Sequence, residues 1–474
     1  MKLSLSKIVV IFAFILTTTA CAQEQGLIYN FFGGGARSEG MGQAFLAISN
    51  DGTAGSWNPA GLYVHEKTLM SFSYDFFMPR GNYTYNVSPG LSKTFAHEGS
   101  YGALNYWSIV SPLRVKNHHF VMNLSYTKNF DTYFKFGERL VDRSTESPNA
   151  LYTKHGRISN ICLALGTRLY EQVSFGLAFN VYMGTVVANE SRTLLHDTTL
   201  QFGTYPYTSN IQLIDSTSYS GFSTILGLMY SSQSIRGGLV VRTPFSLKGS
   251  TDSSIYRISS LNGVEIDDLT DTVYIDEKTS KQEMPLTVGL GAAYNVSENL
   301  LLSVDLEYRN FADKVVKNLD SVLLTAGGER NEFYTDRNPY WKDVWQYRLG
   351  AEYLIHTPIG IIPLRCGFRN EEFPGGNITS YAIRYEGAKG SLTNDSSRIS
   401  YILDSYNKGL ERFHRVTGYS LAGGVGIHWA QIQLDFAYTY TTYKQDIYAS
   451  LDAGVKSSNR WKNHHINFTF TGYF

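Results

Sequence analysis

The chain has 474 residues, and its 41 basic side chains balance its 41 acidic ones, which gives a formal net charge of zero. This balance argues against a nucleic-acid partner, because nucleic acids attract strongly basic surfaces. The 34 tyrosines, 27 phenylalanines and 43 glycines are typical of a membrane barrel with aromatic girdles and a packed lumen.

The first 22 residues have the pattern of a signal peptide. Two lysines precede an apolar run over residues 8–16, which is too short to span a bilayer, and an A-x-A cleavage site ends at Ala22. We therefore expect residues 1–22 to be removed and the mature chain to be exported. Acylation of Cys21 is the alternative, although Thr18 stands where a lipoprotein signal usually has leucine.

A turn-rich block follows over residues 33–62 and reads GGGARSEGMGQAFLAISNDGTAGSWNPAGL. It has too many glycines and too little apolar periodicity for a strand or helix of its own, and its Gly, Asn, Asp and Pro residues favour turns. A compact peptide of this kind needs a host. The long series of amphipathic strands over residues 69–474 predicts one, so we expect the block to lie inside a barrel.

Three segments of this block, ARSEGMGQA at 36–44, ND at 50–51 and WNPAGL at 57–62, resemble the N-terminal hatch of the FadL/TodX family of outer-membrane hydrocarbon and fatty-acid channels, PorV-like relatives included. In that family the hatch plugs the lumen and carries an Asn-Pro-Ala signature. The resemblance implies an all-β fold, a 14-stranded antiparallel transmembrane β-barrel in the bacterial outer membrane, with a hatch over residues 23–67 and a barrel over residues 68–474. The residues that we assign to the hatch are Gly40, Gly42, Asn58, Pro59 and Ala60.

Alternation of apolar and polar residues marks the candidate strands. Every second residue is apolar over residues 302–309 and again over residues 432–440, as a strand between lipid and lumen requires. The last strand repeats the pattern and ends at Phe474, which resembles the signal by which the barrel assembly machinery recognises outer-membrane barrels. A soluble β-sandwich alternates too, but the signal peptide, the girdles and the terminal strand together favour a membrane barrel.

Short and long connections alternate along most of the chain, as periplasmic turns and external loops do in bacterial barrels. Residues 170–172, for example, form a tight turn, whereas residues 189–220 form a long polar stretch. Fifteen candidate strands can be counted, but closure with both ends in the periplasm requires an even number. We therefore merge the first two, over residues 68–78 and 82–95, into one strand with a bulge or kink at residues 79–81, which leaves fourteen.

Enzyme motifs are missing, since the sequence contains no G-x-S-x-G, H-E-x-x-H or G-x-x-x-x-G-K-[ST]. The histidine pairs at 118–119 and 464–465 do not converge on a metal, because adjacent strand residues point to opposite faces. The acidic residues at 265–271 are interpreted as a solvated loop, with a calcium or lipopolysaccharide-bridging ion as the alternative. Cys162 and Cys366 lie on separate predicted strands, which indicates no disulfide. We expect no catalytic residue, no metal and no cofactor.

Glycines within predicted strands, at 289–291 and 423–426, are expected to make room for the hatch rather than to bind a nucleotide. The resemblance implies that an apolar molecule is captured outside, held beside the hatch and released laterally through a kinked third strand. Here the third strand, residues 119–136, has no internal Gly or Pro, and only Asn129 and Asp131 are poor strand formers. The sequence therefore does not predict a break in this strand.

Functions from different classes stay open. The first is passive uptake of hydrophobic small molecules, either long-chain fatty acids or aromatic hydrocarbons. The second is a PorV-like barrel that binds exported proteins as part of a secretion machine, since the hatch sequence suits both. A barrel hydrolase is a third, but no Ser/His or Asp/His pairing stands out. The expected surroundings are outer-membrane lipid and lipopolysaccharide, and the sequence assigns no ligand-binding residue.

Overall fold

The structure is a computed structural model that describes residues 33–88, 91–116, 118–139, 149–200, 203–265, 271–324, 330–337, 341–377, 414–448 and 456–474. The expected signal peptide and residues 23–32 of the expected hatch lie outside these described residues. So do two members of the acidic stretch, Asp267 and Asp268.

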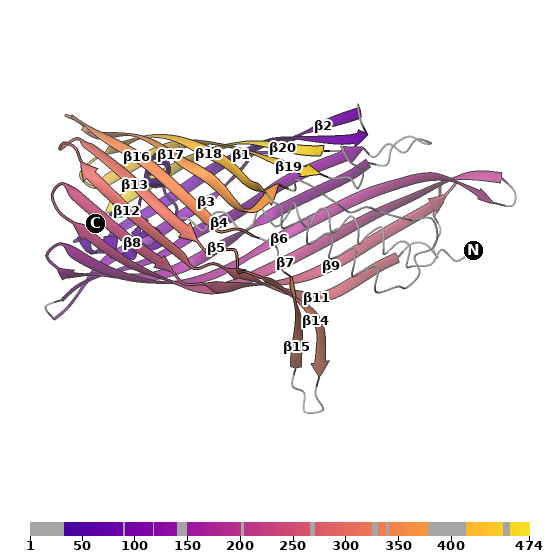
Figure 1. Cartoon of the computed structure of the whole chain (residues 1–474), viewed down its shortest axis with the longest axis horizontal. Coiled ribbons are helices and arrows are strands. Elements are labelled where there is room, and N and C mark those ends of the chain that lie inside the picture. Colours follow the sequence, from indigo (N-terminus) through magenta and orange to yellow (C-terminus); the bar gives the residue numbers. More distant parts are fainter. Residues whose placement is uncertain are drawn as a thin grey trace.

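The described strands pair into one antiparallel sheet that closes on itself (Figure 1). β1 pairs with β20 on one side and with β3 on the other, so the wall has no free edge where it surrounds the hatch. At this level the wall consists of fourteen strands, which confirms the expected fold. These strands are β1 (Leu69–Ser88), β3 (Tyr101–Val115), β4 (His118–Arg139), β5 (Asn149–Tyr170), β6 (Val173–Leu200), β7 (Gly203–Ser231), β8 (Ile235–Arg242), β12 (Thr287–Asn295), β13 (Leu300–Arg309), β16 (Val344–Thr357), β17 (Gly360–Asn377), β18 (His414–His428), β19 (Ile432–Tyr448) and β20 (Lys456–Tyr473).

Further strands continue the wall beyond the hatch. Pro285 lies between β11 and β12, and because proline has no N–H to give to the ladder, one long strand becomes two there. The polar stretch at 189–220 forms a paired hairpin of β6 and β7 rather than an irregular loop. The β14–β15 hairpin leaves the wall and stands away from it (Figure 1). These strands are β2 (Leu91–Glu98), β9 (Phe245–Leu261), β10 (Val264–Glu265), β11 (Asp271–Met284), β14 (Val316–Leu324) and β15 (Arg330–Arg337).

The first ascending strand differs from the expectation. β1 runs without a break through Pro79, and its pairing with β20 keeps one register from Leu69 to Thr84. It ends at Ser88, and β2 then runs back beside it before β3 begins. The expected bulge at residues 79–81 is therefore wrong, and the second candidate strand spans a reversal of the chain. The dipeptide Pro-Gly at 89–90 of the sequence is the turn signal that explains this reversal.

The wall is apolar outside and polar inside. In β13, Leu302 and Val304 are exposed on the outer face, whereas Ser303 and Asp305 are buried on the inner face. A closed antiparallel barrel with an even number of strands and an apolar outer face is the architecture of outer-membrane proteins. The protein is therefore a multi-pass protein of the bacterial outer membrane.

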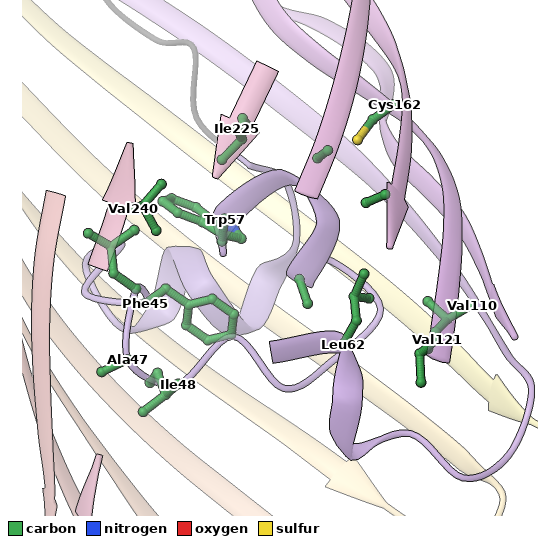
Figure 2. Packing of buried hydrophobic residues seen from close by; sticks show 14 of the residues in the cluster. Phe45, Ala47, Ile48, Trp57, Leu62, Val110, Val121, Cys162, Ile225 and Val240 are labelled. Atoms are coloured by element: carbon green, nitrogen blue, oxygen red, sulfur yellow. The ribbon is translucent and has the colours of Figure 1, made fainter. Parts of the chain in front are cut away.

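The hatch lies inside the barrel, and its described part contains the short helices α2 (Ala36–Gly40), α3 (Ala54–Trp57) and η1 (Pro59–Val64). No helix among the described residues is long and apolar enough to cross a bilayer. Phe45 and Trp57 meet edge to face, with ring centroids 5.9 Å apart, inside a buried cluster that we term the hatch core (Figure 2). The hatch core consists of Met41, Phe45, Leu46, Ala47, Ile48, Ala54, Trp57 and Leu62 of the hatch and Leu69, Val110, Val121, Cys162, Ala164, Ala178, Ile225, Val240, Ala293 and Leu301 of the wall.

Candidate functional site

Asn58 joins two segments of the hatch to the wall. Its side-chain oxygen accepts the N–H of Ala60 at 3.1 Å. Its amide donates to the carbonyls of Leu46, at 2.9 Å, and of Leu228 on β7, at 3.2 Å. Pro59 follows as the first residue of η1, a position where its fixed φ suits the helix and its missing N–H breaks no bond. The polar atoms of the Asn-Pro-Ala segment therefore hold the hatch together.

Glycines on the wall let the hatch backbone approach closely. A Cβ at Gly176 would lie 2.1 Å from the carbonyl carbon of Pro59, and one at Gly424 would lie 3.2 Å from Cα of Gly40. Gly42 has a φ of 60° and lies against the backbone of β17, so a side chain there would be both strained and blocked. The expectation that strand glycines make room for the hatch is confirmed for Gly289, Gly291 and Gly424, whereas Gly423 and Gly426 face other strand residues. The other wall glycines that face the hatch are Gly166, Gly227, Gly238, Gly289, Gly291, Gly350 and Gly367.

Asp305 on β13 anchors the hatch from inside the wall. Its Oδ2 accepts the N–H groups of Phe45, at 2.7 Å, and Leu46, at 3.0 Å. The guanidinium of Arg348 lies 3.9 Å from Asp305 and 3.1 Å from Glu307. This arginine offsets buried negative charge that would otherwise be strongly unfavourable. Because two successive backbone N–H groups of the hatch converge on this one carboxylate oxygen, Asp305 anchors residues 45 and 46 to β13.

Arg37 in α2 makes a second charged anchor. Its guanidinium binds both carboxylate oxygens of Glu352 on β16, at 3.1 and 3.0 Å. Arg365 on β17 binds the same carboxylate at 2.7 Å and continues to Asp435 at 2.6 Å. Burial by itself lowers the pKa of Arg37, but the negative charges of Glu352 and Asp51 raise that pKa above its ordinary value. Arg37 is therefore held in its charged form.

Neutral side chains of β3 and β4 hold another part of the hatch. The carbonyl of Gly52 accepts hydrogen bonds from Tyr106, at 2.6 Å, and from Ser108, at 2.8 Å. Asn123 of β4 lies at 3.5 Å from the same carbonyl. Ionisable side chains of β8, β13, β16 and β17 and neutral side chains of β3 and β4 thus hold the hatch.

The lumen beyond the hatch core has a polar layer and then a second apolar cluster. Along β6, Ala178 belongs to the hatch core, Asn180 to the polar layer and Tyr182 to the second cluster. On β13, Glu307 and Arg309 continue the polar layer and form an ion pair at 2.6 Å. The second cluster, which we term the luminal cluster, consists of Ile158, Tyr182, Leu247, Met284, Phe311, Val316, Trp341 and Val344.

Three of the eight members of the luminal cluster are aromatic, and further aromatic rings pack against it. Tyr182 stacks on Phe245 with ring centroids 4.7 Å apart. Phe311 meets Trp341 edge to face at 5.8 Å. These are the offset and edge-on geometries that aromatic pairs favour. The cluster is therefore a second apolar surface on the inner face of the wall, separated from the hatch core by the polar layer.

The ladder between β3 and β4 is interrupted beside this cluster. It ends at the pair formed by Tyr106 and Thr127. Just beyond, β4 has a bulge at Asn129 against β5, and β3 has one at Asn105 against β1. Further along, β4 pairs with β5 while β3 and β2 pair with β1, and no pairing joins the two groups in the described parts of these strands. We term this interruption the split. Phe130 of β4 lies at the split and packs against the luminal cluster.

The split corrects one sequence-based expectation. The third strand was expected to lack a break because it has no internal Gly or Pro. The bulge at Asn129 shows that a poor strand former is sufficient there. Its neighbour Lys128 binds Asp75 on β1, at 2.8 Å, across β3, and a side-chain contact of this kind cannot be read from the strand alone.

A cavity of about 690 Å³ lies between the hatch and the turns at residues 233–234 and 296–299. Arg37, Asn50, Arg236, Asn295 and Glu352 are among its lining residues. Its lining mixes these groups with apolar side chains such as Leu300, Leu301 and Leu354, and an apolar ligand there would lie against the buried charges of Arg37 and Glu352.

The five predicted hatch residues are all buried in the lumen but lie against different parts of the wall. Gly40 and Gly42 face β17 and β18, whereas Asn58, Pro59 and Ala60 face β6 and β7. Sequence reasoning missed the charged residues that hold them. The alternation pattern could have identified Asp305 and Glu352, since each is an acidic residue on the inner face of an alternating strand. No group of three His, Cys, Asp or Glu residues that could hold a metal occurs in the part of the chain that the structure describes.

Comparison with known proteins identifies relatives of this architecture. The family model described as BamG matches residues 5–357, and no curated protein matches the chain. A FadL homologue from Pseudomonas aeruginosa and the toluene transporter TodX from P. putida each superpose with a TM-score of 0.57 at 12% sequence identity, over 94% of this chain and 99% of theirs. The CymD monoaromatic hydrocarbon channel gives a TM-score of 0.52 at 15% identity, over 94% of this chain and 99% of its own. At these identities the similarity shows a shared fold.

Proposed function

The chain belongs to the BamG family, and we propose that it is a passive outer-membrane channel for hydrophobic small molecules. The observation that carries this proposal is the position of the luminal cluster beside the split, where Phe130 packs against the cluster after β4 has left β3. Moving an apolar molecule from water into such a surface is favourable by about 25 cal/mol per Å² of apolar area buried. The aromatic rings of Tyr182, Phe311 and Trp341 suit aromatic hydrocarbons, and the neighbouring aliphatic side chains suit a fatty-acid chain. The fold shared with two hydrocarbon channels supports this choice.

The polar layer makes passage straight through the lumen unfavourable. Glu307, Arg309 and Arg348 lie between the luminal cluster and the hatch anchor at Asp305. An apolar molecule among them would separate buried charges without replacing their hydrogen bonds. Lateral exit through the split leads into apolar lipid, which favours an apolar molecule over water. We therefore propose capture outside, binding at the luminal cluster and release through the split.

We propose that the hatch, residues 23–67, is a plug rather than part of the ligand site. Asn58 and Pro59 set its turn, while Gly40, Gly42 and Ala60 allow close packing against the wall. In this division residues 68–474 form the barrel and residues 1–22 the signal peptide.

Intrinsic fluorescence tests binding at the luminal cluster, because Trp341 is one of its members. Titration of the purified full chain with toluene, and separately with a long-chain fatty acid, should give a saturable change that Trp341→Phe removes. Trp345→Phe is the matched control, since Trp345 is exposed on the outer wall. No saturable change with either probe, in protein with an intact barrel, would reject the channel.

A second candidate function is a role as a subunit of a machine that handles outer-membrane or exported proteins, of the kind that the family name suggests and that PorV-like barrels represent. The observation that favours it is the β14–β15 hairpin, which pairs with β11 only over residues 280–282 and then stands away from the wall (Figure 1). Unpaired strand edges are a common means of binding another chain. Affinity purification of the tagged protein with and without residues 319–334 tests this role. A large partner whose recovery depends on the hairpin would favour the second function over the first.

A further inference from the structure

Asp75 on β1 is the centre of a buried polar cluster at the start of the split. Its carboxylate accepts hydrogen bonds from Lys128 of β4, at 2.8 Å, and from Asn105 of β3, at 2.9 Å. His465 of β20 lies at 3.0 Å from the same carboxylate. Lys128 also binds Asp131, on its own strand, at 3.0 Å. We term these five residues the latch cluster.

Lys128 is the member that crosses the split. It lies at the β4 bulge, one residue beyond the last backbone pair with β3, where strict alternation no longer fixes the direction of a side chain. Its ammonium reaches Asp75 past β3, where the residue paired with Asp75 is the small Ala103. The side chains of Lys128 and Asp75 are only 7% and 2% exposed. The ion pair therefore ties β4 to β1 at the point where the backbone ladder has ended.

Two side chains link the latch cluster to the hatch. The Asn105 oxygen accepts the N–H of Gly35 at 3.3 Å, while its amide donates to Asp75. His465 lies between Asp75, at 3.0 Å, and Glu39 of α2, at 4.0 Å. A displacement of hatch residues 35–39 would therefore change the partners of both side chains that support Asp75.

The latch cluster also provides partners for each charge if β4 moves away from β1. Lys128 would keep Asp131, because both lie on β4. Asp75 would keep His465, which lies on the neighbouring strand β20. Neither charge would be left buried alone, which is the outcome that makes breaking a buried ion pair strongly unfavourable. The cluster thus has a partnered arrangement for a closed split and another for an open one.

We propose that the Asp75–Lys128 ion pair is a latch that keeps the split narrow while the hatch is seated and that releases β4 when hatch residues 35–39 move. This inference rests on the proposed lateral exit and names the residues that position the gate. Its test needs no ligand, so it can fail or succeed independently of the channel proposal.

Distances between spin labels across the split test the latch in the full chain reconstituted in lipid. Cys366→Ser removes the exposed cysteine, whereas Cys162 is buried and can stay. One pair of labels, at Leu104→Cys and Thr132→Cys, spans the split. A control pair, at Ile109→Cys and Leu124→Cys, spans two residues that face each other in the intact ladder.

Lys128→Met should add a longer population to the distance distribution across the split and leave the control pair unchanged. Lys128→Arg, which keeps the charge, should match the parent protein. Asn105→Ala, which removes the hydrogen bond to Gly35, should shift the distribution in the same direction as Lys128→Met. Asp131→Asn should shift the distance distribution toward shorter distances, because this substitution weakens the partner that Lys128 keeps in the open arrangement.

An unchanged distribution in Lys128→Met would overturn the latch, as would an equal shift of both label pairs, which would indicate general loosening of the barrel. If Lys128→Met does not assemble, Asp75→Asn and Asp131→Asn give the same test, with opposite expected shifts. A shift across the split without saturable ligand binding at Trp341 would support the latch and reject the channel.

Discussion

Replacing Asn58 by Ala is expected to loosen the hatch without opening the barrel. The side chain is fully buried and makes three hydrogen bonds, to Leu46, Ala60 and Leu228. A hydrogen bond of this kind contributes about 1 kcal/mol net, so Asn58→Ala should destabilise the seated hatch by about 3 kcal/mol. Only the bond to Leu228 involves the wall, and the backbone pairs of β7 do not depend on it.

Hydrogen–deuterium exchange read by mass spectrometry measures this effect. A loss of about 3 kcal/mol should speed exchange of the hatch amides on the order of 100-fold when exchange follows local opening. Strand amides should be unaffected. Asn295→Ala is the matched control, because this Asn also donates to a carbonyl, at 2.8 Å, but in an exposed turn. Unchanged hatch exchange in a correctly assembled Asn58→Ala variant would refute the reasoning and leave the charged anchors as the determinants of hatch position.

The double variant of Asn58 and Pro59 to Ala should increase the leak of small hydrophilic solutes in liposome swelling, and unaltered permeability would mean that the hatch is held elsewhere. The purified protein should migrate faster unboiled than boiled, because a closed barrel has no free edge from which to unzip, and equal mobilities would contradict the closed wall. Deleting residues 195–209, at the end of the β6–β7 hairpin that carries Tyr205 and Tyr207, should lower uptake of a radiolabelled fatty acid or alkylbenzene and leave assembly intact. Unchanged uptake, together with loss of a secreted protein in a full knockout, would favour the second function. Burial lowers the pKa of His65 below its ordinary value, although Asp51 opposes this, so the seated hatch favours neutral His65. The exchange protection of the hatch amides should therefore weaken as pH falls through about 6.5. His65→Gln should abolish that pH dependence.

The wall could be predicted because its signal is local. Alternation in residues 302–309 follows directly from the pleat of a strand between lipid and lumen, and the structure exposes Leu302 while it buries Ser303. The wall glycines could be predicted for a related reason, since glycine is unfavourable in a strand unless another backbone approaches closely. The first hairpin was misassigned because alternation continues on both sides of a turn and does not show where the chain reverses.

The anchors of the hatch could not be predicted because their partners are distant in the sequence. Arg37 and Glu352 are separated by 315 residues, and no local pattern pairs them. Lys128 and Asp75 are likewise 53 residues apart, on strands that are not ladder partners. The bulge beside Lys128, at Asn129, has no Gly or Pro as a signal. Charged residues on the inner faces of the strands were therefore the available indication of a filled lumen.

The distribution of charge around the hatch predicts which part of it moves first. Glu352 of β16 holds Arg37 by charge-assisted bonds, and Asp305 of β13 accepts the N–H groups of residues 45 and 46. The Gly52 carbonyl is held by neutral donors of β3 and β4. Charge-assisted bonds are roughly twice as strong, so the segment at 52–55 should release before the segment at 37–46.

This order places the first movement beside β3 and β4, the strands between which the split lies. In the parent protein, amides of residues 52–55 should exchange faster than those of residues 37–46, and Asp305→Ala should remove the difference by weakening the second segment. The reverse order in the parent protein would mean that the hatch leaves β13 and β16 first. Residues 35–39, on which the latch depends, would then move before the segment beside β3 and β4, and the charge of the anchors would not set the order of release.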